Sequence, residues 1–280
     1  MPGTLYLVGT PIGNLGDLSP RAIETLQSVD FIAAEDTRVT LKLLNRFSVK
    51  KPMVAYYEHN RAEMGEKLLS RLLDGESCAL VTDAGMPAIS DPGEDIVRQC
   101  AAQGVTVCAV PGPCALVTAL ALSGLPTQRF CFEGFLSVTA KNRREHLESL
   151  KGETRTMIFY EAPHKLLRTL ADLLEYLGDR EVAVCRELTK LHEEILRTTF
   201  SAALSRFSAP ETPPRGEFVL VVAGAREPEA KMDAAAALEL VRRWREEGKS
   251  LKEACRLAEG KSGFGKNELY RLAVLSEEKL

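Results

Sequence analysis

Apolar runs that alternate with amphipathic stretches restrict the fold of this chain more than any other feature. In the first half, each apolar run is short and leads through a turn signal to a helix signal. Strands are predicted at residues 4–8, 31–34, 78–82 and 105–110. Helices are predicted at residues 20–29, 39–47, 61–73, 94–102 and 114–123, the first capped by Ser19. This alternation predicts an α/β fold whose parallel sheet is covered on both faces.

The second half has a more mixed pattern. Strands are predicted at residues 129–132, 157–160, 182–185 and 218–222, and helices at residues 142–150 and 164–177. A Gly-Leu-Pro segment at 124–126 suits a hinge between two lobes, and a charged linker at 223–231 precedes a helical tail that starts at Asp233. We therefore expect an N-terminal α/β lobe (1–122), a C-terminal α/β lobe (123–225) and a linker with a helical module (226–280).

Composition limits the class and compartment of the protein. The net charge is −3, so a nucleic-acid partner would have to be met by a local patch of cations. Seven cysteines without a C-x-x-C motif indicate reduced thiols in a cytoplasmic protein, with no metal-binding framework. The N-terminal segment does not have the pattern of a signal peptide. Residues 99–128 carry no charge, but Pro111 and Pro113 interrupt them, so we expect a strand, a turn and a helix and no membrane span.

Two glycine-containing turns follow predicted strands. The first, VGTPIGNLG, does not have the spacing of the dinucleotide fingerprint or of a phosphate-binding loop. It is therefore either a turn that brings its backbone close to a ligand or simply a tight turn. The second, VTDAGMPAISDPG at 81–93, combines two glycines and two prolines with apolar residues. It suits either a structural turn or a rigid loop that holds a ligand.

Several polar clusters have both a functional and a structural interpretation. Glu35 and Asp36 end a strand and are expected to face a ligand cleft, although Arg38 offers them another partner. His59 is either a general base or a structural histidine. Residues 141–144 contain three cations, which contact phosphates or form a solvated helix start. The tail carries six cations and three glutamates between residues 249 and 271, which suits a helix-turn-helix unit or a packing module.

Six segments occur in an order that resembles one known family. They are VGTPIGNLGDLSPRAIETL, AAEDTR, VTDAGMPAISDPG, VPGPCA, FYEAPHKL and RELTKLHEE. Over residues 4–224 the chain is similar to the tetrapyrrole methylases, and its tail resembles a small C-terminal module found in the family. The resemblance implies two α/β lobes with S-adenosylmethionine in the cleft between them, usually in a homodimer. It is greatest to members that methylate the ribose 2′-oxygen of a cytidine in the decoding region of 16S ribosomal RNA, within the small ribosomal subunit.

The resemblance also implies roles for individual residues. The implied cofactor-binding residues are Pro11, Ile12, Gly13, Asp83, Gly85, Met86, Ile89, Pro113, Cys114, Ala115, Tyr160, Leu188 and Phe218. Candidates for the general base are Glu35, Asp36, His59 and Glu161, and candidates for RNA contact are Arg38, Lys141, Arg143, Arg144 and Lys190. The chain departs from the family pattern at Met86, where an acidic residue is usual. It also departs at 137–140, which separate Gly134-Phe135-Leu136 from the basic run.

Three other functions are compatible with parts of the sequence. A porphyrinoid C-methyltransferase would share the fold, but the EDTR and YYEHN segments and the tail match the RNA enzyme better. A nucleic-acid-binding regulator would use the tail to bind and the α/β part to sense a ligand. The spacing of the first turn argues against a dehydrogenase.

Overall fold

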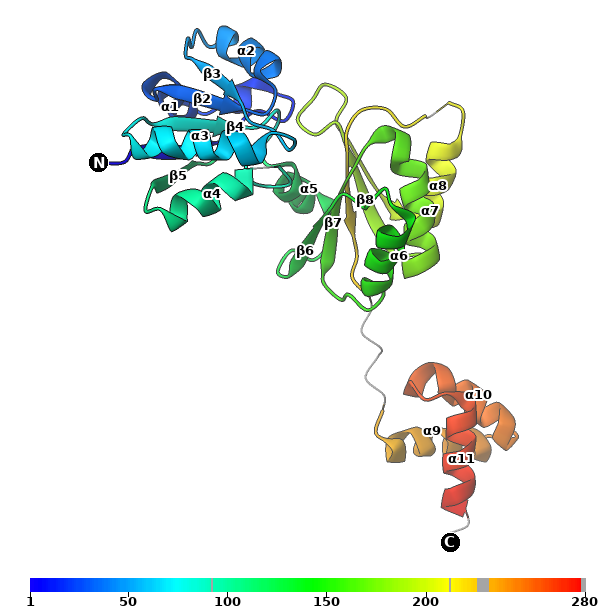
Figure 1. Ribbon diagram of the computed structural model, residues 1–280. Coiled ribbons are helices and arrows are strands. Elements are labelled where there is room, and N and C mark those ends of the chain that lie inside the picture. Colours follow the sequence, from blue (N-terminus) through cyan, green and yellow to red (C-terminus); the bar gives the residue numbers. More distant parts are fainter. Residues whose placement is uncertain (92, 212, 226–231, 278–280) are drawn as a thin grey trace. The chain divides into compact units, whose positions relative to one another are not determined.

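The computed structural model describes residues 1–91, 93–211, 213–225 and 232–277 (Figure 1). The chain divides into two compact units, Met1–Gly224 and Ala225–Leu280. The first unit contains two five-stranded sheets, and the described part of the second unit is helical.

The first sheet is parallel throughout. Its strands are β1 (Thr4–Val8), β2 (Phe31–Ala34), β3 (Met53–Ala55), β4 (Cys78–Val81) and β5 (Thr106–Val110), in the order β3-β2-β4-β1-β5. The predicted parallel sheet is thus confirmed. The edge strand β3 was not predicted, because its three residues are only half-buried and form too short an apolar run.

Helices cover both faces of this sheet, as predicted. They are α1 (Pro20–Ser28), α2 (Thr37–Arg46), α3 (Arg61–Leu73) and α4 (Gly93–Ala102). Leu26 of α1 and Leu44 of α2 belong to one core cluster, whereas Leu68 of α3 and Ile96 of α4 belong to another. Helix α2 begins two residues before the predicted start, because the carboxylate of Asp36 accepts a hydrogen bond from the Arg38 N–H at 2.8 Å and caps the helix.

The second sheet is mixed. Its strands are β6 (Phe130–Gly134), β7 (Thr156–Glu161), β8 (Glu181–Arg186), β9 (Glu194–Thr199) and β10 (Phe218–Val222), in the order β6-β7-β10-β8-β9. Only β6 and β7 pair in parallel. Strand β9 and helix α8 (Phe200–Ser208) were not predicted. Strand β9 lies at the sheet edge and carries Glu194 and Arg197 among half-buried residues, so its apolar signal is weak.

Helices also cover both faces of the second sheet. Helices α6 (Ala140–Ser149), α7 (Leu166–Leu177) and α8 share one core cluster with it, and a 3-10 turn (Pro163–Lys165) leads into α7. Helix α5 (Ala115–Ser123) packs on the other face through Leu116, Ala119 and Leu120. We retain the two lobes as a proposal, and the packing of α5 favours a boundary before this helix rather than after residue 122. Within the described residues, no helix is long and apolar enough to cross a membrane.

The second unit contains three described helices with a core of their own. Helices α9 (Ala234–Glu246), α10 (Leu251–Ser262) and α11 (Lys266–Glu277) bury small and aliphatic side chains between them. Ser250 and Glu253 form a reciprocal capping box at the start of α10. Helix α10 continues to Ser262, and Gly263 terminates it with a φ of +71°. Most of the predicted linker, 226–231, lies outside the described residues.

Candidate cofactor cavity

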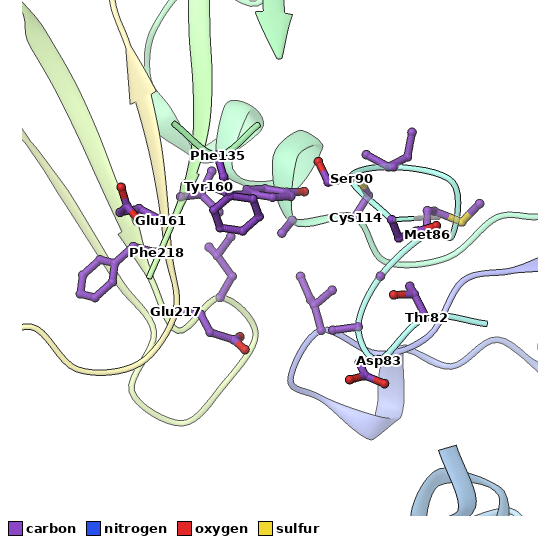
Figure 2. Close-up of a pocket in the computed structure, with 18 of the residues that line it drawn as sticks. Thr82, Asp83, Met86, Ser90, Cys114, Phe135, Tyr160, Glu161, Glu217 and Phe218 are labelled. Carbon is purple, nitrogen blue, oxygen red and sulfur yellow. The ribbon is translucent and has the colours of Figure 1, made fainter. Parts of the chain in front are cut away.

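A cavity of about 470 Å³ lies between the two lobes of the first unit. On one side it is lined by the turn after β1 and the loop after β4, as Figure 2 shows for Thr82, Asp83 and Met86. On the other side it is lined by the ends of β7 and β10, with Tyr160 and Phe218 labelled in the same view. The carboxyl ends of parallel strands are where α/β sheets bind ligands.

Backbone hydrogen bonds join the two glycine-containing turns. Thr10 and Gly85 exchange N–H···O bonds of 2.9 and 3.1 Å, and the Thr10 hydroxyl donates to the Thr82 carbonyl at 3.0 Å. Gly85 has a φ of +93°, which favours glycine. The loop after β4 is therefore both a structural turn and a wall of the cavity, so the two interpretations of its sequence are compatible.

A second pair of turns meets at Gly9 and Gly112. A Cβ atom on Gly9 would lie 2.7 Å from the Cα of Gly112, and one on Gly112 would lie 2.9 Å from the Cα of Gly9. Only glycine at both positions allows this approach, which sets the turn after β1 against the turn that leads into α5. Cys114 and Ala115 then reach the cavity.

The loop after β4 has a constrained conformation. Ala88 and Ser90 both lie in the left-handed region, with φ of +68° and +61°. Asp91 holds this shape, because its Oδ1 accepts hydrogen bonds from the N–H groups of Ala88 (2.9 Å) and Gly93 (2.7 Å). Non-glycine residues with such dihedrals are common at ligand-binding sites, where the surrounding structure enforces them.

The opposite wall is aromatic. The Tyr160 ring makes edge-to-face contacts with Phe132 (centroids 4.9 Å apart) and Phe135 (5.6 Å). The Tyr160 hydroxyl accepts a hydrogen bond of 3.1 Å from the N–H of Leu116, in the first turn of α5. Burial raises the pKa of Tyr160 to about 12, so its phenol stays neutral at ordinary pH.

The cavity has a one-sided charge. Its described lining contains five carboxylates, from Glu35, Asp83, Asp91, Glu161 and Glu217, and no lysine, arginine or histidine. Burial raises the pKa of Asp83 and of Asp91, and the neighbouring Glu35 carboxylate adds to both shifts. Such a lining attracts cations and disfavours phosphates, which usually bind to arginine, lysine or helix N-termini.

Of the four candidates for the general base, two line the cavity. Glu35 accepts a hydrogen bond from the Thr82 hydroxyl at 2.5 Å and one from the Asp83 N–H at 3.3 Å. Asp36 is outside the lining, where it caps α2 and forms an ion pair with Arg38 (2.6 Å), and the Arg38 guanidinium lowers the pKa of Asp36 to about 2. His59 is exposed and also outside the lining.

Glu161 lies at the cavity, but its carboxylate is occupied. It accepts hydrogen bonds from the N–H of Ala162 (2.8 Å) and from the Thr169 hydroxyl. Arg143 in turn donates to Thr169 (2.8 Å) and to Asp172 (2.6 Å). Figure 2 shows the Glu161 carboxylate pointing away from the loop after β4. This network makes Glu161 a structural residue rather than a mobile base.

The same network corrects the expectation for Arg143. Its side chain is only 5% exposed and is bound within the second lobe, so it cannot reach a phosphate in solvent. The other four candidates for RNA contact have more exposed side chains. Arg38 pairs with Asp36, Lys141 lies 4.0 Å from Glu145, and Arg144 is exposed on α6. The Lys190 ammonium lies 2.9 Å from both Glu187 and Glu217, and its stem passes over Gly13.

The structure brings most of the predicted cofactor-binding residues together. Those in the lining are Ile12, Asp83, Gly85, Met86, Ile89, Cys114, Ala115, Tyr160, Leu188 and Phe218, and those outside it are Pro11, Gly13 and Pro113. Sequence reasoning missed further lining residues: Thr82, Ala84, Ser90, Asp91, Phe135, Ala162, Pro163, Glu217 and Val219. Most of these adjoin predicted residues. Phe135 belongs to the Gly134-Phe135-Leu136 segment of the family pattern, which was not assigned to the cofactor, and Glu217 carries no motif of its own.

The fold and the cavity define a class of two-lobed α/β proteins that includes methyltransferases. A solved structure of diphthine synthase is similar, with a TM-score of 0.60 at 16% identity over 79% of this chain and 90% of that chain. Residues 4–204 match the family of Tetrapyrrole (Corrin/Porphyrin) Methylases, and the chain belongs to this family.

Curated relatives carry a more specific name. A protein of Escherichia coli O157:H7 named ribosomal RNA small subunit methyltransferase I is 45% identical over 97% of this chain and 95% of its own length. A protein of Thermotoga maritima with the same name is 50% identical, over 79% of this chain and 99% of its own length.

Proposed function

We propose that this chain transfers a methyl group from S-adenosylmethionine to the ribose 2′-oxygen of a cytidine in the decoding region of 16S ribosomal RNA. The observation that carries the proposal is the 45% identity, over nearly the whole chain, to a relative named as a small-subunit ribosomal RNA methyltransferase. The cytidine and its 2′-oxygen come from the family resemblance of the six sequence segments. The small ribosomal subunit is the proposed partner.

The alternatives have less support. Similar solved structures include a uroporphyrin-III-C-methyltransferase from Thermus thermophilus, but at 19% identity this likeness shows the fold alone. A ligand-sensing regulator has no support from the relatives. The Escherichia coli O157:H7 relative, which matches nearly the whole chain, is named a methyltransferase. The relatives therefore favour ribosomal RNA as the acceptor.

The described cavity fits S-adenosylmethionine in size and charge. The cofactor carries a sulfonium and an ammonium, and the carboxylates of the lining suit both cations. Apolar side chains such as Ile12 and Leu188 offer surfaces to its adenine, and the backbone of the loop after β4 offers hydrogen-bonding groups. When bound, the cofactor supplies an already activated methyl group. The enzyme's part is to align the acceptor oxygen and to remove its proton.

Among the acids of the cavity, Asp83 is the proposed general base. Its Oδ1 accepts a hydrogen bond of 3.1 Å from the Asp36 N–H, and Glu35 accepts one from the N–H of Asp83 itself. The side chain is thus fixed in the loop after β4. Partial burial, with the nearby Glu35 carboxylate, raises its pKa, which increases its strength as a base toward a hydroxyl proton. Glu35 would act by positioning Asp83 and Thr82.

Methyl transfer to small ribosomal subunits from cells that lack this protein is the direct test. The full chain and labelled S-adenosylmethionine are incubated with these subunits, and the product is mapped by nuclease digestion and mass spectrometry. We expect a single 2′-O-methylcytidine. Cofactor binding without transfer to subunits or to naked 16S ribosomal RNA would contradict the proposal and would favour a small-molecule acceptor.

We also propose that the protein acts in the cytoplasm, where small subunits are assembled, and as a homodimer. The family resemblance supports the dimer. Sedimentation equilibrium of the full chain measures its mass in solution, and a value of one chain mass at micromolar concentration would rule the dimer out.

A further inference from the structure

A groove beside the cofactor cavity has a different lining. It has a volume of about 240 Å³ and is formed by the turn after β1, by α2 and by the loop after β4. Its apolar lining residues are Pro11, Leu15, Val39 and Leu43. Leu15 and Val39 are 46% and 40% exposed, although both are large apolar side chains. We call this surface the α2 groove.

The α2 groove and the cofactor cavity share part of one wall. Thr82 and Asp83 line both, so a ligand in the α2 groove would meet the cavity at these two residues. In Figure 2, Thr82 and Asp83 lie on the side of the cavity opposite Tyr160 and Phe135. The α2 groove thus opens next to the carboxylate that we propose as the base.

Helix α2 gives the α2 groove a cationic border. Arg38, Lys42 and Arg46 follow each other at intervals of four residues, and the helix contains no acid. This interval places them in one row about 6 Å apart along the helix axis. Lys42 lines the α2 groove itself. Within the described residues, neither Lys42 nor Arg46 has an ion pair, whereas on α3 and α4 Lys67 and Arg98 pair with acids of their own helix.

Apolar walls beside a row of cations, two of which have no ion pair among the described residues, suit a single-stranded nucleotide. An unstacked base is bound by apolar contact with its faces, and the phosphates before and after it are neutralised by arginine and lysine. The volume suits one pyrimidine ring better than a macrocycle of four pyrroles. The overall charge of −3 makes this local row more informative, because the chain is not basic as a whole.

We propose that the α2 groove is the acceptor-nucleotide site. The base lies between Leu15 and Val39, the RNA backbone follows Arg38, Lys42 and Arg46, and the ribose points to Asp83 at the shared wall. This inference rests on the proposed function, because it requires RNA as the methyl acceptor. It adds the side of the cavity from which the RNA enters and the helix that binds its backbone.

Two pairs of matched variants of the full chain test this site. The first compares Lys42→Ala/Arg46→Ala with Lys67→Ala/Arg129→Ala, which removes the same charge from exposed positions outside the α2 groove. The second compares Val39→Glu with Leu41→Glu, since both residues are exposed on α2 and only Val39 lines the α2 groove. The measurements are binding to unmethylated small ribosomal subunits as a function of salt, steady-state methyl transfer, and calorimetric affinity for S-adenosylmethionine.

Loss of two phosphate contacts should flatten the dependence of log K on log salt by about 1.4, because each contact to single-stranded RNA contributes about 0.7. We expect this change and a higher KM for subunits in Lys42→Ala/Arg46→Ala, and a KM at least tenfold higher in Val39→Glu. Both control variants should behave as wild type, and all four should keep the wild-type cofactor affinity, which shows that the first unit is folded.

The outcomes separate this site from the proposed function. If the wild type methylates subunits and each variant matches its control, the α2 groove is not the acceptor site and the function stands. If the wild type neither binds nor methylates RNA, the proposed function fails and the acceptor site fails with it.

Discussion

The two walls of the cofactor cavity are built by different means. The first-lobe wall consists of turns held by backbone hydrogen bonds, with Gly9 against Gly112 and Thr10 bonded to Gly85. The second-lobe wall consists of side chains on strand ends, with Tyr160 in edge-to-face contact with Phe135 and Glu161 fixed by Thr169. The shape of the first-lobe wall depends on a few positions where only one residue type fits. The shape of the second-lobe wall depends on packing contacts shared among several side chains.

This difference has a functional consequence. The constrained turns and the acids of the first lobe, Glu35 and Asp83, provide fixed polar groups, and fixed groups suit the alignment of reacting atoms. The aromatic wall provides shape and excludes water, and it tolerates small changes better. Substitutions in the two walls should therefore differ in which step of the reaction they affect.

The largest effect is expected for Asp83→Asn in the first wall. Loss of a general base should lower kcat about 10²–10⁴-fold. Any loss of affinity for S-adenosylmethionine, whose cations the lining carboxylates suit, should be smaller than this loss of kcat. Because the base acts when deprotonated, the wild-type rate should rise with pH through the raised pKa of Asp83 and then level off. The variant should lose this rise.

The matched control is Asp36→Asn, just outside the cavity. Its carboxylate has a pKa of about 2 and caps α2, and asparagine caps a helix equally well. We expect less than a threefold change in kcat, measured by steady-state methyl transfer. A larger loss in Asp36→Asn than in Asp83→Asn would reverse our assignment of the base.

In the second wall, the largest loss of stability is expected on substitution of Arg143, which is buried behind the residues that line the cavity. Arg143→Met leaves Asp172 and Thr169 without their buried partner, and the free energy of unfolding should fall by about 2–3 kcal/mol. This loss of stability is smaller than is usual when one partner of a buried ion pair is removed, because Arg168 also lies 3.8 Å from Asp172 and still pairs with it. Urea unfolding measures it.

Arg144→Met is the control, since Arg144 is exposed on the same helix. Its unfolding free energy should stay within about 0.5 kcal/mol of wild type. An Arg143→Met protein of native stability with a weaker salt dependence of RNA binding would return Arg143 to the set of RNA contacts.

A smaller effect is expected for Gly112→Ala, which tests whether the first wall requires the close approach of its two turns. The added Cβ would lie 2.9 Å from the Cα and the carbonyl oxygen of Gly9, so the two turns must move apart. Such overpacking costs about 1–3 kcal/mol, which corresponds to a loss of about five- to 150-fold in cofactor affinity if it acts wholly on binding. Calorimetric titration measures this loss. Gly152→Ala, where a Cβ meets nothing within 4 Å, should bind the cofactor as wild type does.

The smallest effect is expected for Tyr160→Phe in the second wall. The ring and its aromatic contacts remain, but the N–H of Leu116 loses its acceptor at 3.1 Å. The loss of one such hydrogen bond costs about 1 kcal/mol, so cofactor affinity should fall no more than about fivefold. Tyr57→Phe, at an exposed position outside the cavity, is the control. A loss greater than tenfold would mean that the hydroxyl contacts the ligand directly.

The same contrast explains how much could be predicted from the sequence. The first wall consists of turns that glycine and proline mark, so the loop after β4 and the turn after β1 could be identified as cavity walls from their residues. In the second wall, Phe135 and Glu217 reach the cavity only because β6 and β10 lie on either side of β7. Sheet order is set by long-range pairing, which local patterns do not encode.

Burial of charged residues was the other limit. A run such as Lys141-Asn142-Arg143-Arg144 suggests a solvated patch, because arginine is almost never fully buried without a partner. The partner of Arg143 is Asp172, 29 residues away on α7. Strand β9 was missed for a related reason, since an edge strand with polar residues has little apolar signal. For Arg143 the decisive neighbour is distant in sequence, whereas β9 pairs with the preceding strand β8.

The separate core of the three-helix unit has a consequence for how such genes change. Helices α9, α10 and α11 pack on one another through residues such as Val241, Cys255 and Leu269. A segment that satisfies its own packing can be acquired or discarded by recombination without disturbing its neighbour. The relative from Thermotoga maritima matches 79% of this chain over 99% of its own length, so about a fifth of this chain has no counterpart in it.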